Sequence, residues 1–203
     1  MKNSANITEA SKLEIDMMGF IFYSKSPRYV EDSYIPDTPG NIHRTGVFVN
    51  TYGDTIYETA RKHNLTHIQL HGYESPLFCE KLRQHGFKVI KAISVLTSED
   101  INIASEYEGA TDYLLFDTKS QEYGGTGKKF NWSVLSAYNG TTPFLLSGGI
   151  NINDADEICA FRHPLFAGID LNSGFEISPG EKDILKLSSF IDTINNKQKS
   201  HTK

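Results

Sequence analysis

The sequence predicts an α/β protein, a (βα)8 (TIM) barrel from which the first β-strand is missing. Short apolar runs rich in β-branched and aromatic residues alternate with longer amphipathic stretches from Met17 onward, which is the pattern of repeated βα units. Polar and glycine-rich residues gather just after the predicted strands, where a β/α barrel carries its functional loops. The first predicted element is a helix, with no strand before it.

The apolar runs place seven strands along the chain. Their near-continuous apolar character is typical of parallel strands that are buried on both faces. The strands are expected at residues 17–23, 45–50, 67–71, 88–95, 112–117, 143–147 and 165–170. The amphipathic stretches predict helices near residues 5–15, 53–63, 75–85, 98–106, 131–138, 153–161 and 181–196.

The start of the chain departs from the barrel pattern. Asn6 and Glu9 have the spacing of a helix N-cap and its partner three residues later, and only a few residues precede them. A closed eight-stranded barrel needs a strand there, because seven strands leave two unpaired edges beside a gap. We expect a monomer unless copies associate through these edges.

Composition and charge bound the function. With 203 residues, 38% of them hydrophobic, the chain is predicted to form one β/α-barrel domain over residues 1–203. A net charge of −5 argues against a nucleic-acid partner. No apolar run is long enough to span a membrane, and the polar start lacks a secretory signal, so a cytoplasmic protein is expected. Two distant cysteines, Cys79 and Cys159, favour a reducing compartment over a disulfide framework.

Two glycine-containing segments predict a phosphate site. Gly148 and Gly149 end the apolar run at 143–147, and glycines let backbone N–H groups approach an anion closely. Alone, this segment fits a turn that needs positive φ equally well. A second polar segment follows the next predicted strand, and the loops after the last two barrel strands are where such folds bind phosphate. It contributes Asn172, Ser173 and Gly174.

Several strings, in their order and spacing, resemble the phosphoribosylanthranilate isomerase family. They are GFIFYSKSPRYV (19–30), GVFVN (46–50), IQLHGYES (68–75), LLFDT (114–118), GGTGKKFNW (124–132), LLSGGI (145–150) and IDLNSGFEISPGEKD (169–183). The resemblance implies a cytoplasmic enzyme of tryptophan biosynthesis that catalyses an Amadori rearrangement. Its substrate is a small phosphorylated molecule, N-(5-phosphoribosyl)anthranilate. Both bond changes are proton transfers, so no metal or organic cofactor is expected.

The rearrangement needs a general acid and a general base. Asp117 matches the family's acid. The family's base is a cysteine in a Lys-x-Cys-Gly segment that ends the first strand, and this sequence contains no such segment. Cys79 and Cys159 fall within predicted helices at packing positions. We therefore expect the segment to be encoded in frame just upstream of Met1.

Further residues are expected to contact the substrate, and for the first of them the resemblance supplies the role. Arg28 corresponds to the residue that receives the anthranilate carboxylate. Gln69 and His71 are expected to bind ribose hydroxyls, although a structural histidine is almost equally compatible. Asp170 orients the substrate nitrogen or holds the phosphate loop. A lid is expected at Gly124, Gly125, Thr126 and Gly127, and Glu176 with the PGEKD turn is expected to fix the last helix.

Two other functions stay open at this point. Another ribose-phosphate-acting β/α barrel would need metal-binding histidines at strand ends, as in an epimerase, or a lysine acid at the rim, as in an indole-glycerol-phosphate synthase. Neither pattern is found. A catalytically impaired phosphate-binding barrel remains an alternative, because the expected base is absent.

Overall fold

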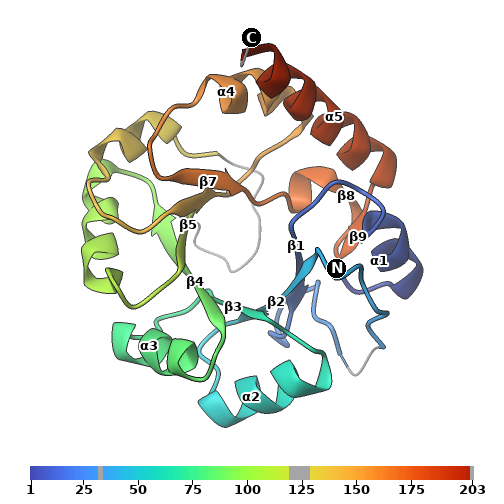
Figure 1. Ribbon diagram of the computed structural model, residues 1–203, viewed down its shortest axis with the longest axis vertical. Helices are drawn as coiled ribbons and strands as arrows, with labels where there is room; N and C mark the ends of the chain where they lie inside the picture. The colour runs from blue at the N-terminus through green and yellow to red at the C-terminus, as the bar shows by residue number, and fades with distance from the viewer. Residues whose placement is uncertain (32–33, 119–128, 202–203) are drawn as a thin grey trace.

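In the computed structural model, seven parallel strands form one curved sheet in which the strand order follows the chain (Figure 1). The structure describes residues 1–31, 34–118 and 129–201. Every strand lies within two residues of its predicted bounds, so the α/β prediction is confirmed. The strands are β1 (Met17–Ile21), β2 (His43–Phe48), β3 (His67–Leu70), β4 (Lys88–Val95), β5 (Tyr113–Thr118), β6 (Phe144–Leu146) and β7 (Phe166–Ile169).

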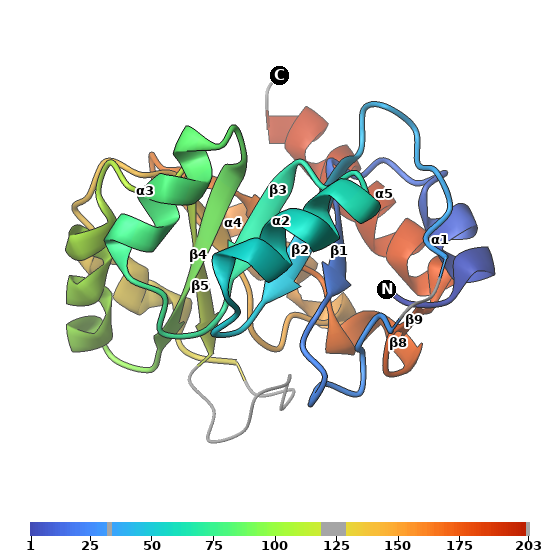
Figure 2. The ribbon, with the colours of Figure 1, turned by 90° about the horizontal axis from the view of Figure 1, so that it is seen from below.

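Helices lie outside the ring of strands and alternate with them along the chain (Figures 1 and 2). The α-helices are α1 (Ser4–Ala10), α2 (Gly53–Lys62), α3 (Pro76–Gln84), α4 (Ala155–Ala160) and α5 (Ile184–His201). Two stretches predicted as helices form the tighter 3-10 type, η1 (Ser98–Tyr107) and η2 (Trp132–Ala137). Two short 3-10 turns, η3 (Ile152–Asp154) and η4 (Ser173–Phe175), lie in the loops after β6 and β7.

The predicted cap of the first helix is wrong. Asn3 is the N-cap of α1, and its side chain accepts a hydrogen bond from the backbone N–H of Asn6 at 3.0 Å. The Asn6 amide instead exchanges two hydrogen bonds with the backbone of Lys182, at 2.8 and 2.7 Å. A partner 176 positions away therefore outweighs the local capping pattern.

A short antiparallel hairpin precedes the last helix and was not predicted. It consists of β8 (Glu176–Ser178) and β9 (Glu181–Lys182), joined through Gly180 at a φ of +86°. In Figure 1 the hairpin lies next to α1 and the N-terminus. Strands of two and three residues are too short to show an alternating pattern, and the hairpin delays the start of α5 to Ile184.

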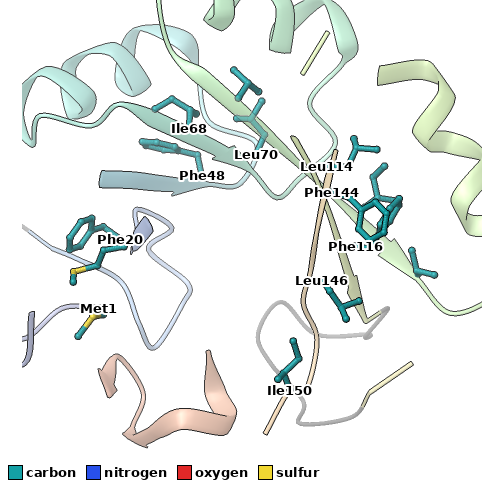
Figure 3. Packing of buried hydrophobic residues seen from close by; sticks show 14 of the residues in the cluster. Met1, Phe20, Phe48, Ile68, Leu70, Leu114, Phe116, Phe144, Leu146 and Ile150 are labelled. Carbon is teal, nitrogen blue, oxygen red and sulfur yellow. The ribbon is translucent and has the colours of Figure 1, made fainter. Parts of the chain in front are cut away.

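Both faces of the sheet carry apolar side chains, which explains the continuous apolar runs. The main core lies between the sheet and the helices and includes Phe20, Phe48, Phe116 and Phe144 (Figure 3). A smaller cluster on the inner face contains Ile90, Ala92 and Leu115. These inner residues line a central cavity of about 1350 Å³.

β1 and β7 are the two edges of the seven-stranded sheet (Figure 1). Within the described residues, each pairs with a strand on one side only. Beside β1, the terminal amine of Met1 donates a hydrogen bond to the carbonyl oxygen of Gly19 at 2.7 Å. Burial lowers the pKa of this amine to about 5, with Lys182 the next contributor, so the amine is neutral at pH 7.

No described helix is both long and apolar enough to cross a membrane.

Candidate active site

The central cavity collects most of the predicted site residues. Many of its polar lining residues lie at or just after the carboxyl ends of the strands, the rim where β/α barrels carry function. Gly174 is the one described residue of the predicted set that does not line it. The predicted residues that do are Arg28, Gln69, His71, Asp117, Gly148, Gly149, Asp170, Asn172 and Ser173.

Asp117 ends a chain of hydrogen bonds at this rim. Gln69 Nε2 lies 3.1 Å from His71 Nδ1, and His71 Nε2 lies 3.2 Å from Asp117 Oδ2. The amide nitrogen of Gln69 is a donor, so the His71 Nδ1 that it faces accepts the hydrogen bond. His71 Nε2 therefore carries the ring hydrogen and donates it to Asp117. About a quarter of the Asp117 and His71 side chains is exposed (26% and 28%), so both reach the cavity. The Asp117 carboxylate is therefore held by His71, which is in turn held by Gln69.

The first glycine loop packs against the same carboxylate. Gly148 and Gly149 have φ values of +86° and +72°, in the left-handed region that favours glycine. A Cβ at Gly148 would overlap Thr118 and come within 2.8 Å of Asp117 Oδ1. The turn requirement considered from the sequence therefore holds, and it places the loop directly beside Asp117.

The second loop touches the first one. Gly174 lies so close to the Ile150 carbonyl oxygen that a Cβ there would overlap it. Gly174 is therefore a packing contact between the loops, while Asn172 and Ser173 face the cavity. Asp170, at the start of this loop, accepts a hydrogen bond from Ser147 Oγ at 3.0 Å. Burial raises the pKa of Asp170, and the nearby charge of Asp117 adds to the effect.

Arg28 is already paired. Its Nε lies 3.0 Å from both carboxylate oxygens of Glu176, and its Nη2 lies 2.7 Å from Glu176 Oε2. The expectation that Glu176 and the PGEKD turn fix the last helix holds for the turn but not for the Glu176 carboxylate, which bonds Arg28, Lys182 and the Gly180 N–H. Asp183 does hold that helix, through the N–H of Lys186 at 3.0 Å.

Lys182 is a cavity residue that the sequence interpretation missed. Its ammonium lies 3.3 Å from Glu176 and 2.9 Å from the side-chain oxygen of Asn172. From the sequence, a lysine in a Pro-Gly turn is expected to be exposed to solvent. In the folded protein Lys182 is buried. The predicted lid, Gly124 to Gly127, lies outside the described residues.

Neither cysteine lies at the cavity. Cys79 is fully buried in α3, and burial raises the pKa of its thiol to about 11. Cys159 lies in α4. The prediction that both occupy packing positions is confirmed. In the part of the chain that the structure describes, no three His, Cys, Asp or Glu side chains are arranged to hold a metal ion.

Seven parallel strands around a cavity, with polar residues following the strand ends, define a protein of the β/α-barrel class. The family model described as N-(5'phosphoribosyl)anthranilate (PRA) isomerase matches residues 1–193. The chain belongs to this family.

Curated relatives and solved structures agree. The N-(5'-phosphoribosyl)anthranilate isomerase of Parabacteroides distasonis is 49% identical over 199 residues, covering 96% of this chain and 90% of that protein. The one from Phocaeicola vulgatus is 46% identical, covering 97% and 96%. The Thermotoga maritima enzyme superposes with a TM-score of 0.82 at 31% identity, covering 97% and 96%. A further isomerase structure holds reduced 1-(o-carboxyphenylamino)-1-deoxyribulose 5-phosphate (TM-score 0.81, 28% identity, covering 97% and 95%).

Proposed function

We propose that this chain is the isomerase that converts N-(5-phosphoribosyl)anthranilate into 1-(o-carboxyphenylamino)-1-deoxyribulose 5-phosphate in tryptophan biosynthesis. The observation that carries the assignment is the position of Asp117, beside the Gly148–Gly149 loop and at the end of the His71–Gln69 chain. A proton donor next to an anion-binding loop suits a substrate that is phosphorylated at one end and opens its ring at the other. The proposal places residues 1–203 in one cytoplasmic domain, with no metal or organic cofactor.

The phosphate is held by backbone N–H groups. Gly148 and Gly149 present N–H donors without a Cβ in the way, and Ser173 begins the short η4 turn in the facing loop. Gly174 supports these donors by letting the two loops pack together. Such local donors bind an anion whatever the net charge of the protein.

Asp117 acts as the general acid. It protonates the ribose ring oxygen, so that the ring opens to a Schiff base, and a general base then removes the C2 proton. His71 donates to one oxygen of Asp117 and leaves the other facing the N–H of Thr118 at 2.8 Å. This adds a second role to the expected contacts of Gln69 and His71 with ribose. Asp170 also lines the cavity, close enough for the charges of Asp117 and His71 to act on it, and it orients the substrate nitrogen.

The base enters with an eighth strand. The edge of β1 faces a gap toward β7, and the residues lining the cavity there include Met17, Gly19 and Ile21 of β1 and Ala167 and Ile169 of β7. The Gly19 carbonyl already accepts a hydrogen bond along this edge. In this proposal a parallel strand carrying the family's Lys-x-Cys-Gly segment pairs with this edge and brings its thiol to the cavity. Until the gap is filled, the two edges also offer a route for self-association.

Turnover with and without that strand tests the proposal. The chain alone is expected to bind the reduced product analogue yet turn over about 10²- to 10⁴-fold more slowly than the strand-completed protein, because it lacks one proton carrier. The same chain with the strand's cysteine replaced by alanine is the matched control, since it restores packing without the base. Full activity of the unextended chain would refute the assignment of the base.

A phosphate-binding barrel without catalysis is the second candidate. The observation that favours it is that neither Cys79 nor Cys159 lines the cavity. It predicts that the strand-completed protein still binds the product analogue and remains inactive.

A further inference from the structure

Three charged side chains form a buried cluster between the rim and the β8–β9 hairpin. They are Arg28, Glu176 and Lys182, whose side chains are 10%, 5% and 9% exposed. Arg28 Nη2 lies 2.7 Å from one oxygen of Glu176, and Lys182 Nζ lies 3.3 Å from the other. Arg28 and Lys182 both line the cavity. The cluster therefore carries one net positive charge at the wall of the site.

Lys182 is held as a fixed charge. Besides Glu176, its ammonium faces the carbonyl oxygens of Leu171 at 3.2 Å and Asn172 at 3.0 Å. The side-chain oxygen of Asn172 lies at 2.9 Å. These acceptors use all the ammonium hydrogens. The backbone of Lys182 is fixed independently by Asn6, so replacing the side chain leaves that anchor in place.

Arg28 keeps one edge of its guanidinium available. A guanidinium has five N–H donors in a planar fork. Glu176 takes the side edge, formed by Nε and one hydrogen on Nη2. The end edge, formed by Nη1 and the second hydrogen on Nη2, has no acceptor among the described residues. This edge has the spacing of a bidentate carboxylate contact.

A second carboxylate on Arg28 would normally be opposed by the first. The Arg28–Glu176 pair is neutral as a unit, so an incoming anion gains little from it and is repelled by Glu176. Lys182 offsets the charge of Glu176 from the opposite side. With Lys182 present, Arg28 presents a full positive charge to the cavity in a wall shielded from water.

We propose that Lys182 is a positioning residue for substrate specificity, which neutralises Glu176 so that the end edge of Arg28 receives the carboxylate of the substrate's aromatic ring. The inference rests on the proposed function for the identity of that carboxylate. It adds a residue outside the proton chemistry that decides whether an aromatic acid is preferred to the matching ring without the acid group.

The test compares two ligands on the same protein. Calorimetry measures the Kd of reduced 1-(o-carboxyphenylamino)-1-deoxyribulose 5-phosphate and of the same compound without the ring carboxylate. The variants are Lys182→Met, which removes charge and donors, and Lys182→Gln, which keeps an N–H donor for the loop carbonyls. Lys186→Met is the matched control, because Lys186 lies nearby on α5 and does not line the cavity.

Both Lys182 variants are expected to weaken the carboxylate ligand about tenfold more than the ligand without it, as for loss of a charge-assisted contact. Lys186→Met should leave the ratio unchanged. Equal weakening of both ligands would reduce Lys182 to a structural role and overturn the inference, as would an unchanged ratio. Arg28→Met distinguishes failure of the inference about Lys182 from failure of the proposed function. If Arg28→Met does not alter the ratio of the two Kd values, Arg28 does not contact the carboxylate and that part of the proposed function fails. A wild-type chain that binds neither ligand overturns both.

Discussion

The two ends of the strands use their polar residues in opposite ways. At the carboxyl ends, Asp117, His71 and Arg28 line a cavity, and the end edge of the Arg28 guanidinium has no acceptor among the described residues. At the amino ends, His67 and Asp112 do not line the cavity and contact other groups of the protein. The fold thus places the residues available to a ligand at one end of the strands and residues that stabilise strand packing at the other. Substitutions at one end should change chemistry, and those at the other should change stability.

The largest expected effect lies at the rim. In the strand-completed protein, Asp117→Asn should lower kcat about 10²- to 10⁴-fold, because an amide cannot donate the proton that opens the ring. The free energy of unfolding should fall by only about 1 kcal/mol, because the amide oxygen can still accept from His71 and only the Thr118 N–H loses its acceptor. Steady-state kinetics and urea unfolding measure the two quantities. A stability loss large enough to account for the lost activity would erase the contrast between the two ends.

At the amino ends, the next effect is a dependence of stability on pH. His67 stacks against His43 with ring centroids 4.5 Å apart, and burial, followed by the neighbouring His43, lowers its pKa to about 4. Its folded pKa therefore lies below the ordinary value near 6.5, and the unfolded state binds the proton more tightly. The stabilisation is complete above about pH 6.5 and is lost as the pH falls toward 4, up to about 3 kcal/mol.

His67→Gln isolates this contribution from the carboxylates that also titrate in acid. The difference in unfolding free energy between wild type and variant should shrink as the pH is lowered from 7 to 4. Urea titrations at each pH measure it. A difference that stays constant across this range would show that His67 does not titrate as its surroundings require.

The sequence was informative where structure depends on runs of residues. β4 lies at its predicted residues because six of its eight positions, all but Lys88 and Ser94, are buried on the two faces of the sheet. It was uninformative where one distant contact decides. The Asn6 side chain bonds Lys182 on β9 and does not cap α1. Arg28 pairs with Glu176, which lies 148 positions away in the sequence. No local pattern records such pairs, because the fold alone brings them together.

The candidate site divides in the same way. The glycine loops and Asp117 follow apolar strands, so their meeting at one rim could be inferred from the alternation of strands and helices. The hydrogen bonds from Gln69 through His71 to Asp117 could not be predicted from the sequence, because they depend on the curvature of the sheet, which turns the ends of β3 and β5 toward the same cavity. The burial of Lys182 could not be predicted either, because it depends on the β8–β9 hairpin, which the sequence did not indicate.

The smallest effect compares two substitutions within one cluster at the amino ends. Asp112 accepts from the N–H of Val89 at 2.9 Å, from Lys88 at 2.9 Å and from Arg83 at 3.2 Å. Its side chain is 11% exposed, whereas that of Lys88 is 62% exposed. Asp112→Ala should cost about 2 kcal/mol, because it leaves the Val89 N–H without its carboxylate partner.

Lys88→Met removes only a solvent-exposed ion pair and should cost less than about 0.5 kcal/mol. Urea unfolding at pH 7 and in high salt measures both variants. Added salt should shrink the Lys88 effect further and leave most of the Asp112 effect, since the Val89 hydrogen bond is shielded from ions. Equal costs for the two would mean that charge pairing, and not the buried backbone contact, holds the amino ends of β4 and β5 together.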